Sequence, residues 1–270
     1  MSLEAAAAYA ERHGLEALLV RRDGETLFER YGAGFDANKP HALYSGTKSF
    51  WGPVALAAEE EGLLSLDERV GETFDAWNVG RKMSVTLREL LQLTSGIGFG
   101  GLGSAVPSYE KALAVELKNE PGTVFTYGGI PLQIFGAVLA KKLETQRLSP
   151  HEYLQMRILD RAGVKIDMWR TLASGTKPLP TGAFVAAAQW ASYGRFVLDS
   201  PALAPCFVGS AVNPKYGLGW WLDASGVPYA SGSAGQAMYL LASERTVIVK
   251  FGRSSSYKHD AFLRHLRAAA

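Results

Sequence analysis

Residues 17–31 read ALLVRRDGETLFERY, in which two strand-like runs, 17–22 and 26–31, are separated by Asp23-Gly24. An Asp-Gly pair between two such runs favours a β-hairpin, because both residues accept the positive φ angles of a tight turn. The preceding residues, 4–12, have the composition of a helix. The chain is therefore expected to begin with a helix followed by two antiparallel strands.

The other end of the chain returns to strand-like runs. Strands are expected over 216–222, 236–241 and 246–251, followed by a last helix over 258–267. From residue 45 to about 207 the apolar residues recur mostly at helical spacing. The helical candidates in this middle part are 50–58, 87–93 (opened by the capping box Thr86-x-x-Glu89), 132–143 and 184–198.

Strands at both ends of a chain can assemble into one antiparallel sheet. The predicted fold class is therefore α+β: a sheet built from N- and C-terminal strands and flanked by the terminal helices, with an inserted all-helical lobe. We expect one domain, 1–270, with an α/β lobe formed by 1–44 and 210–270 and a helical lobe formed by 45–209. A ligand cleft is expected where the two lobes meet.

Composition excludes several partner classes. The 270 residues include 28 basic and 26 acidic side chains, a net charge of +2, which gives no electrostatic reason to expect nucleic acid or an anionic membrane. No run of about 18 apolar residues is present, so no spanning helix is expected. The single cysteine, Cys206, cannot form an intrachain disulfide and is expected to be buried. Glu4 and Glu11 make the N-terminus too polar for a signal peptide, which predicts a cytoplasmic protein.

The segment Ser45-Gly46-Thr47-Lys48 fits the S-x-x-K motif of acyl-transfer enzymes. Residues three apart in a helix share a face, so Lys48 can hold its amine beside the Ser45 hydroxyl. Burial can then shift the amine toward its neutral, basic form. The apolar helix that follows would bury the lysine, which is costly without a function, although Pro53 is expected to kink that helix or alter its second turn.

The motif alone is weak evidence, because it recurs at three other places. Ser174-Gly175-Thr176-Lys177 runs into Pro178-Leu179-Pro180, which a helix cannot easily cross. Ser108 and Ser255 each precede an amphipathic segment and are expected to be helix N-caps. Only the copy at Ser45 leads into an apolar helix.

Several segments resemble, in their order along the chain, those of the serine β-lactamase/penicillin-binding superfamily. The similarity is greatest to its class C-like branch, which includes esterases, D-amino-acid peptidases and amide hydrolases, and it covers nearly the whole chain. The segments are LYSGTKSF (43–50), EGLLSLD (61–67), SVTLRELL followed by TSG (84–96), PGTVFTY (121–127) and YGLGWW (216–221). Single segments match weakly, but this ordering is hard to obtain by chance.

The resemblance implies a role for individual residues. Ser45 would be the nucleophile, Lys48 and Tyr127 its acid/base partners, and the backbone N–H groups of Ser45 and Ser233 the oxyanion hole. Ser231, Gly232, Gly129 and Trp221 would contact the substrate, Trp221 as a cleft wall.

Two positions depart from the family pattern. Gly129 stands where the family usually has asparagine, and Ala230 stands where it has a cation, Lys or His, before Ser231-Gly232. Both departures argue against recognition of penicillin or D-Ala-D-Ala, and they are compatible with an altered substrate or with lost catalysis.

The sequence thus predicts a serine hydrolase that acts on a small-molecule ester, amide or lactam through an acyl-enzyme, with no metal or organic cofactor. The alternatives are a true β-lactamase or D-Ala-D-Ala carboxypeptidase, and a catalytically silent member that binds an acyl or peptide ligand. The five histidines form no metal-like pair. The G-x-G-x-x-G at Gly96 follows a helical segment instead of a strand, so we interpret it as a loop near the cleft.

Overall fold

The computed structural model describes residues 1–268, and its main feature is a six-stranded sheet in the order β2-β1-β9-β8-β7-β6. N- and C-terminal strands meet in the middle of this sheet, where β1 pairs antiparallel with β9 and Leu19 lies opposite Val249. The bounds of the strands are β1 (Leu15–Arg22), β2 (Glu25–Tyr31), β6 (Trp221–Leu222), β7 (Pro228–Gly232), β8 (Gln236–Leu241) and β9 (Thr246–Gly252). The α+β fold class predicted from the sequence is confirmed.

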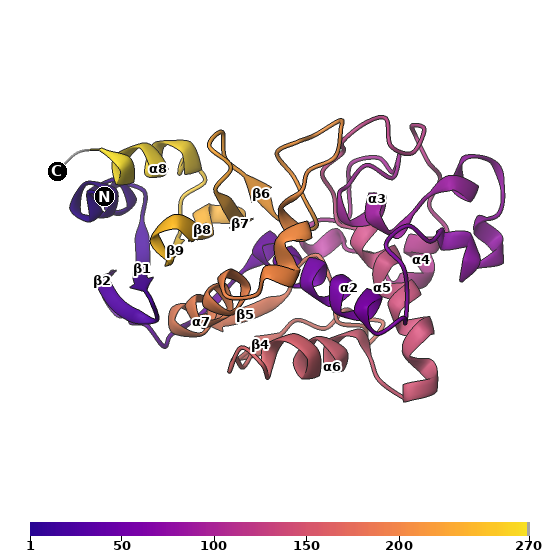
Figure 1. Cartoon of the computed structure of the whole chain (residues 1–270), viewed down its shortest axis with the longest axis horizontal. Helices are drawn as coiled ribbons and strands as arrows, with labels where there is room; N and C mark the ends of the chain where they lie inside the picture. The colour runs from indigo at the N-terminus through magenta and orange to yellow at the C-terminus, as the bar shows by residue number, and fades with distance from the viewer. Residues whose placement is uncertain (269–270) are drawn as a thin grey trace.

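The helices fall mainly between β2 and β6 along the chain (Figure 1). Their bounds are α1 (Leu3–Arg12), α2 (Trp51–Glu60), α3 (Leu87–Leu91), α4 (Tyr109–Leu113), α5 (Ile130–Leu143), α6 (Pro150–Leu154), α7 (Ala187–Leu198) and α8 (His259–Arg267). A 3₁₀ helix, η1 (Tyr44–Phe50), runs directly into α2. The remaining strands form a second, three-stranded sheet in the order β3 (Pro40–Ala42), β5 (Ala183–Ala186) and β4 (Met168–Trp169).

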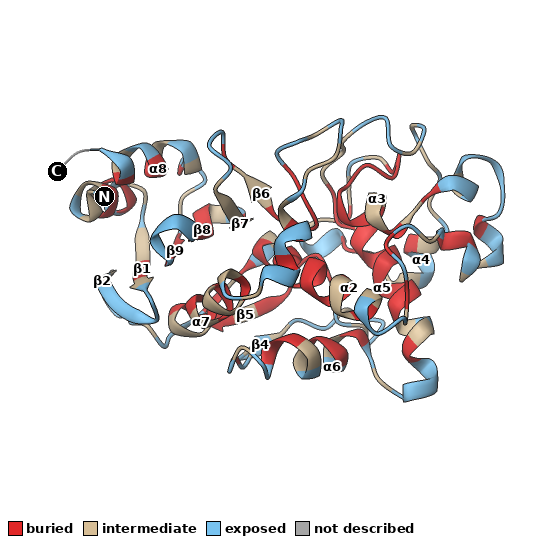
Figure 2. Ribbon diagram, in the orientation of Figure 1, coloured by how far each residue is buried: buried red, intermediate tan, exposed pale blue. Residues whose placement is uncertain are grey.

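The two faces of the large sheet bury different cores, because alternate residues of a strand point to opposite sides. Leu18 and Val20 of β1 pack with side chains of α1 and α8, whereas Ala17 and Leu19 belong to the larger core that extends into the helical part. Helices α1 and α8, which carry the two chain ends, lie side by side on one face (Figures 1 and 2). Helix α7 covers the other face, against β1, β8 and β9. The division into lobes 1–44 with 210–270 and 45–209 stays a prediction.

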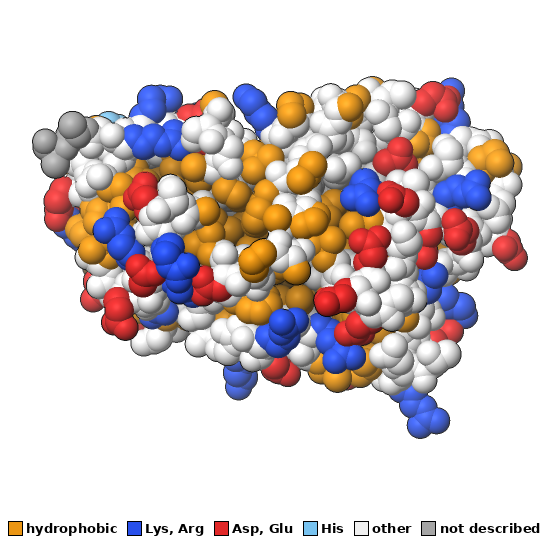
Figure 3. All heavy atoms as spheres, in the orientation of Figure 1, with side chains coloured by type: hydrophobic (Ala, Val, Ile, Leu, Met, Phe, Trp, Pro, Cys, Tyr) orange, Lys and Arg blue, Asp and Glu red, His pale blue; other side chains and the backbone are white. Residues whose placement is uncertain are grey.

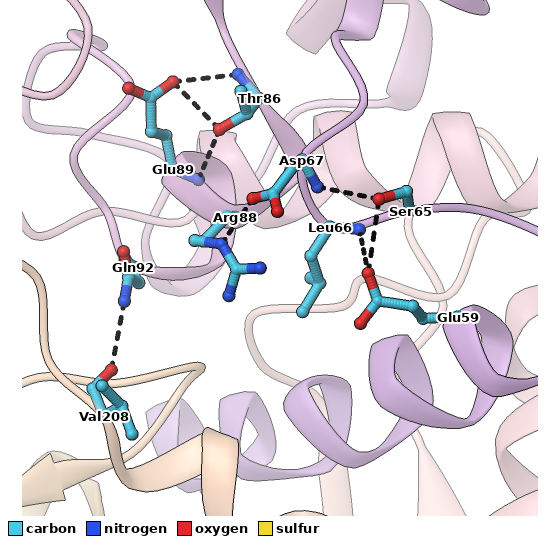
Figure 4. A network of polar contacts seen from close by, with 9 residues as sticks. All are labelled: Glu59, Ser65, Leu66, Asp67, Thr86, Arg88, Glu89, Gln92 and Val208. Carbon is cyan, nitrogen blue, oxygen red and sulfur yellow. Dashed lines mark hydrogen bonds and ion pairs between the residues drawn. The ribbon is translucent and has the colours of Figure 1, made fainter.

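Polar contacts fix the irregular segment between α2 and α3 (Figure 4). The predicted capping box is present: Thr86 accepts a hydrogen bond from the Glu89 backbone, and the Glu89 carboxylate accepts one from the Thr86 backbone. Asp67 pairs with Arg88, and Glu59 at the end of α2 accepts from the Leu66 backbone at 2.7 Å. These contacts hold a long connection with little regular structure against the helices.

Several expected elements differ in their bounds. Residues 184–186 of the expected helix 184–198 are in β5, and the helix begins only at Ala187. The expected strand 216–222 is reduced to β6, because Gly219, with φ of +81°, bends the chain before it. Ser108 is an N-cap as predicted, but Ser255 is not, since α8 begins four residues later, after Lys258.

Pro53 lies close to the point where the helix type changes. The helical path changes from 3₁₀ to α at Trp51, so Pro53 occupies the first turn of α2. In a first turn the missing N–H of proline costs no hydrogen bond within the helix.

The surface shows no dominant charge. On the face drawn in Figure 3, basic and acidic side chains are interspersed around a central band of hydrophobic side chains. Within residues 1–268, no helix combines the length and the hydropathy that crossing a bilayer requires.

Candidate active site

Ser45 and Lys48 lie on the same side of η1 (Tyr44–Phe50). A 3₁₀ helix has three residues per turn, so side chains three apart eclipse each other. Lys48 Nζ is 3.0 Å from Ser45 Oγ, a hydrogen-bonding distance. The 3₁₀ geometry thus aligns the amine and the hydroxyl more directly than the α-helix expected from the sequence.

The Lys48 side chain is buried, with an exposed fraction of 1%. Its other hydrogen bond goes to the Pro180 carbonyl oxygen at 3.3 Å, and among the described residues no carboxylate forms an ion pair with it. Burial lowers the pKa of Lys48 to about 7, because the charged form loses its hydration without gaining a counter-charge. A large fraction of the amine is therefore neutral near neutral pH.

Two buried donors hold the C-terminal part of η1. Tyr193 Oη donates to the Ser49 carbonyl oxygen at 2.7 Å, and Trp220 Nε1 donates to the same oxygen at 3.0 Å. The residue before the nucleophile candidate, Tyr44, has φ of +47°, a left-handed conformation that non-glycine residues rarely adopt. The turn that presents Ser45 is therefore strained and is held by packing on both sides.

Tyr127 reaches this site from the segment before α5 (Ile130–Leu143). Lys48 Nζ lies 4.8 Å from the centre of the Tyr127 ring, and the ring stacks on Trp221 with centroids 5.6 Å apart. Burial raises the pKa of the Tyr127 phenol, and a hydrogen bond with Ser45 offsets part of that rise. The structure thus brings a hydroxyl, an amine and a phenol from distant segments together.

A cavity of about 340 Å³ opens beside these groups. Its lining residues are Ser45, Tyr127, Trp221, Tyr229, Ser231, Gly232, Ser233 and His259. Six of the eight were predicted from the sequence as site residues. A larger cavity of about 580 Å³, beside α6, contains none of the predicted residues.

The approach of β7 to η1 depends on Gly232. A Cβ atom at this position would lie 2.1 Å from the Leu43 carbonyl oxygen, so any side chain would push the strand away. Ser233 follows as the first residue of a short 3₁₀ turn, and Ser45 is the second residue of η1. The N–H groups at the start of a helix have no partner within it, so both can donate to a ligand between them.

Gly129 is not among the residues that line the cavity. It is buried, its N–H donates to the Gly100 carbonyl oxygen at 2.9 Å, and a Cβ atom on it would lie 1.9 Å from the Gly101 carbonyl oxygen. The glycine-rich segment interpreted as a loop is indeed a loop, and it occupies the space that a side chain at 129 would need. The family asparagine therefore cannot be accommodated here without moving that loop.

Ala230 is 1% exposed and belongs to the main core, so this position supplies no cation to the cavity. The sequence reasoning missed two lining residues, Tyr229 and His259. Tyr229 alternates with Ser231 along β7, a signal that the strand pattern contains. His259, in the first turn of α8, carried no signal, because only the pairing of helices and strands in space brings it to Ser231.

Among residues 1–268 no cluster of three metal-ligating side chains occurs. The hydroxyl and amine groups of the site are those of acyl transfer by a serine nucleophile.

A family model and several solved structures match this chain. A family model described as Beta-lactamase matches residues 5–270. No curated protein sequence matches the chain.

Solved structures with the same fold have low sequence identity. A beta-lactamase/D-alanine carboxypeptidase from Pseudomonas syringae is 14% identical with a TM-score of 0.78, and 99% of each chain is covered. A class C beta-lactamase from Rhodobacter sphaeroides is 18% identical with a TM-score of 0.73, covering 97% of each chain. EstCE1, described as a hydrolase with promiscuous acyltransferase activity, is 14% identical with a TM-score of 0.76, covering 98% of each chain.

Proposed function

Because this chain belongs to the beta-lactamase family, we propose that it is a serine hydrolase that cleaves a small-molecule ester or amide through an acyl-enzyme on Ser45. The observation that carries the proposal is the 3.0 Å contact between Ser45 Oγ and the buried amine of Lys48. A nucleophile with a base in hydrogen-bonding reach is the arrangement that covalent catalysis requires. The base is effective near neutral pH because burial brings its pKa to about 7.

The reaction has two steps. Ser45 Oγ attacks the carbonyl carbon while its proton passes to the neutral amine of Lys48. The bond to the leaving alcohol or amine then breaks, and that group takes a proton through Lys48 and Tyr127. In the second step water attacks the acyl carbon and gives a proton to the same base, which returns it to Ser45 Oγ as the bond between Oγ and the acyl carbon breaks and the acid leaves.

The developing oxyanion lies between the backbone N–H groups of Ser45 and Ser233. These two donors begin separate helical turns, and Gly232 lets the turns approach each other. Donors that are fixed before the reaction stabilise the transition state without reorganisation, and loss of one donor costs roughly 10²–10³ in rate in comparable sites.

An ester or simple amide suits the cavity better than a β-lactam or D-Ala-D-Ala. The amide donor expected at 129 is replaced by a buried glycine, and Ala230 packs in the core. The cavity therefore lacks two groups that the family uses to hold a carboxylated peptide-like substrate. A β-lactamase or carboxypeptidase, and a silent ligand-binding member, are the alternatives.

Turnover of short p-nitrophenyl esters beside a chromogenic cephalosporin tests the proposal. We expect the esters to be hydrolysed with the higher kcat/KM. A higher kcat/KM for the cephalosporin would favour the lactamase alternative. Absence of both activities and of any acyl adduct by intact mass would favour the silent alternative.

A further inference from the structure

A chain of hydrogen bonds leads from the interior to the cavity and plays no part in the two-step reaction above. Tyr257 Oη is 2.9 Å from Tyr239 Oη, which is 2.7 Å from His259 Nδ1. His259 Nε2 is in turn 2.9 Å from Ser231 Oγ. Ser231 and His259 line the cavity, whereas Tyr239 and Tyr257 are buried in the core beneath α8.

The need of each buried hydroxyl for an acceptor determines which atom donates in each hydrogen bond of this chain. The Tyr257 hydroxyl has no other hydrogen-bond partner among the described residues, so its hydrogen must go to Tyr239 or remain unsatisfied in the core. The Tyr239 hydrogen then goes to His259 Nδ1, which leaves the ring hydrogen on Nε2 to be donated to Ser231. The Ser231 hydroxyl accepts that bond, and its own hydrogen is free to point into the cavity.

The neutral ring that this order requires agrees with the surroundings of His259. Burial, followed by the nearby positive charge of Lys250, lowers the pKa of His259 to about 4, although Asp260 acts in the opposite sense. The Lys250 amine itself is directed elsewhere, to the Gly235 carbonyl oxygen at 3.0 Å. The imidazole is therefore a fixed neutral donor instead of a cation.

The cavity contains no permanent charge. None of its lining residues is a lysine, arginine, aspartate or glutamate. Near the cavity, the Lys250 amine is directed to the Gly235 carbonyl oxygen, and Asp223 is paired with Arg267 at 2.7 Å. A carboxylate on the substrate would thus lose its hydration without finding a cation among the lining residues.

We propose that Ser231 recognises the acyl part of the substrate as a neutral hydrogen-bond donor, that His259 positions it, and that the cavity, whose lining holds no cation, takes uncharged acyl groups in preference to carboxylated ones. The inference rests on the proposed function, because it assigns the substrate class of the same cavity. A neutral donor can satisfy a carbonyl or ester oxygen of the substrate. It offsets only a small part of the desolvation of a carboxylate.

The test uses two ligands that differ in one charge and one methyl group, the monophenyl ester of adipic acid and its methyl ester. Binding to the Ser45→Ala variant by isothermal titration calorimetry measures the preference without turnover. We expect the methyl ester to bind about tenfold more tightly. Equal affinity, tighter binding of the carboxylate, or no binding of either ligand would overturn the inference.

Failure of the proposed function has a different signature. Intact-mass analysis of the wild-type protein with the methyl ester would then show no adduct on Ser45, whatever the binding preference of the Ser45→Ala variant.

Variants of the pair, made in the Ser45→Ala background, test the two roles. Ser231→Ala is expected to weaken binding of the methyl ester about three- to tenfold, the usual effect of one neutral hydrogen bond. His259→Phe should weaken binding in the same way, whereas His259→Gln, whose amide can donate to Ser231, should retain most of the affinity.

His265→Gln is the matched control, because His265 lies on the same helix but stacks on Tyr9, away from the cavity. An unchanged affinity for the methyl ester in both Ser231→Ala and His259→Phe would contradict the assignment. A comparable loss of affinity in His265→Gln would do the same.

Discussion

Lys48 Nζ lies 3.0 Å from Ser45 Oγ at a site where no acidic side chain pairs with the amine within the described part of the chain. The contact is therefore between the proposed nucleophile and an amine whose pKa burial alone has lowered to about 7. Three of the predictions below depend on this contact.

The rate of Ser45 acylation should rise with pH and level off above a midpoint near 7. Below that pH Lys48 is protonated and cannot take the Ser45 proton, whereas above it the amine is free. Labelling by a fluorophosphonate at several pH values, read as the rate of adduct formation, measures the profile. A midpoint near 10, the value of an ordinary lysine, would show that Lys48 is not the base.

Lys48→Ala and Tyr127→Phe are each expected to slow acylation by about 10² or more, the usual contribution of acid/base groups. Tyr127→Phe keeps the ring that stacks on Trp221 and removes only the hydroxyl. Pre-steady-state kinetics with a p-nitrophenyl ester separates acylation from deacylation. Near wild-type rates in both variants would mean that these two residues do not have the roles assigned to them.

Lys48→Met should stabilise the fold at pH 7. The pKa of Lys48 is lower in the folded chain than in the unfolded one, so between pH 7 and 10.5 the unfolded chain binds the extra proton and stability rises with pH. We expect the free energy of unfolding at pH 7 to rise by about 2 kcal/mol. The pKa shift alone would give more, at about 1.4 kcal/mol per pKa unit, but the hydrogen bonds of Nζ are lost too.

Urea unfolding of both proteins at pH 7 and 10 measures that difference. The difference in the free energy of unfolding between Lys48→Met and the wild type should be smaller at pH 10 than at pH 7. A constant gap would argue against a shifted pKa.

Gly129→Asn should destabilise the protein by about 2 kcal/mol or more instead of restoring lactam turnover. The new Cβ would overlap the Gly101 carbonyl oxygen, which belongs to backbone that cannot rotate away as a side chain could. Thermal unfolding and cephalosporin turnover are the measurements. If the Gly129→Asn variant were stable and hydrolysed lactams, the loop that contains Gly101 would have to move to accommodate the new side chain.

The sequence predicted those parts of the fold that local patterns encode. The Asp23-Gly24 turn, the strand 236–241 and the Thr86-Glu89 box depend on neighbouring residues, and all three are present. The bounds around Ala187 and Trp221 were wrong because tertiary contacts decided them. There β5 pairs with β3, and Gly219, with a positive φ, passes so close to the Lys48 carbonyl oxygen that a Cβ atom would lie 2.4 Å from it.

The sequence predicted those lining residues of the candidate site that lie in segments resembling the family pattern. Ser45, Tyr127 and Ser233 come from three separate segments, and the cavity has all three in its lining. Two features could not be read from the order of residues. The 3₁₀ form of η1 depends on donors from Tyr193 and Trp220, and His259 reaches Ser231 only because α8 packs on β8.

The identity of the nucleophile is tested most directly by peptide mapping of the protein after reaction with a fluorophosphonate, with the Ser45→Ala variant treated in parallel. The account predicts one adduct on the wild-type chain, located on Ser45, and none on the variant. An adduct on Ser231, or labelling of the variant at the wild-type rate, would contradict it.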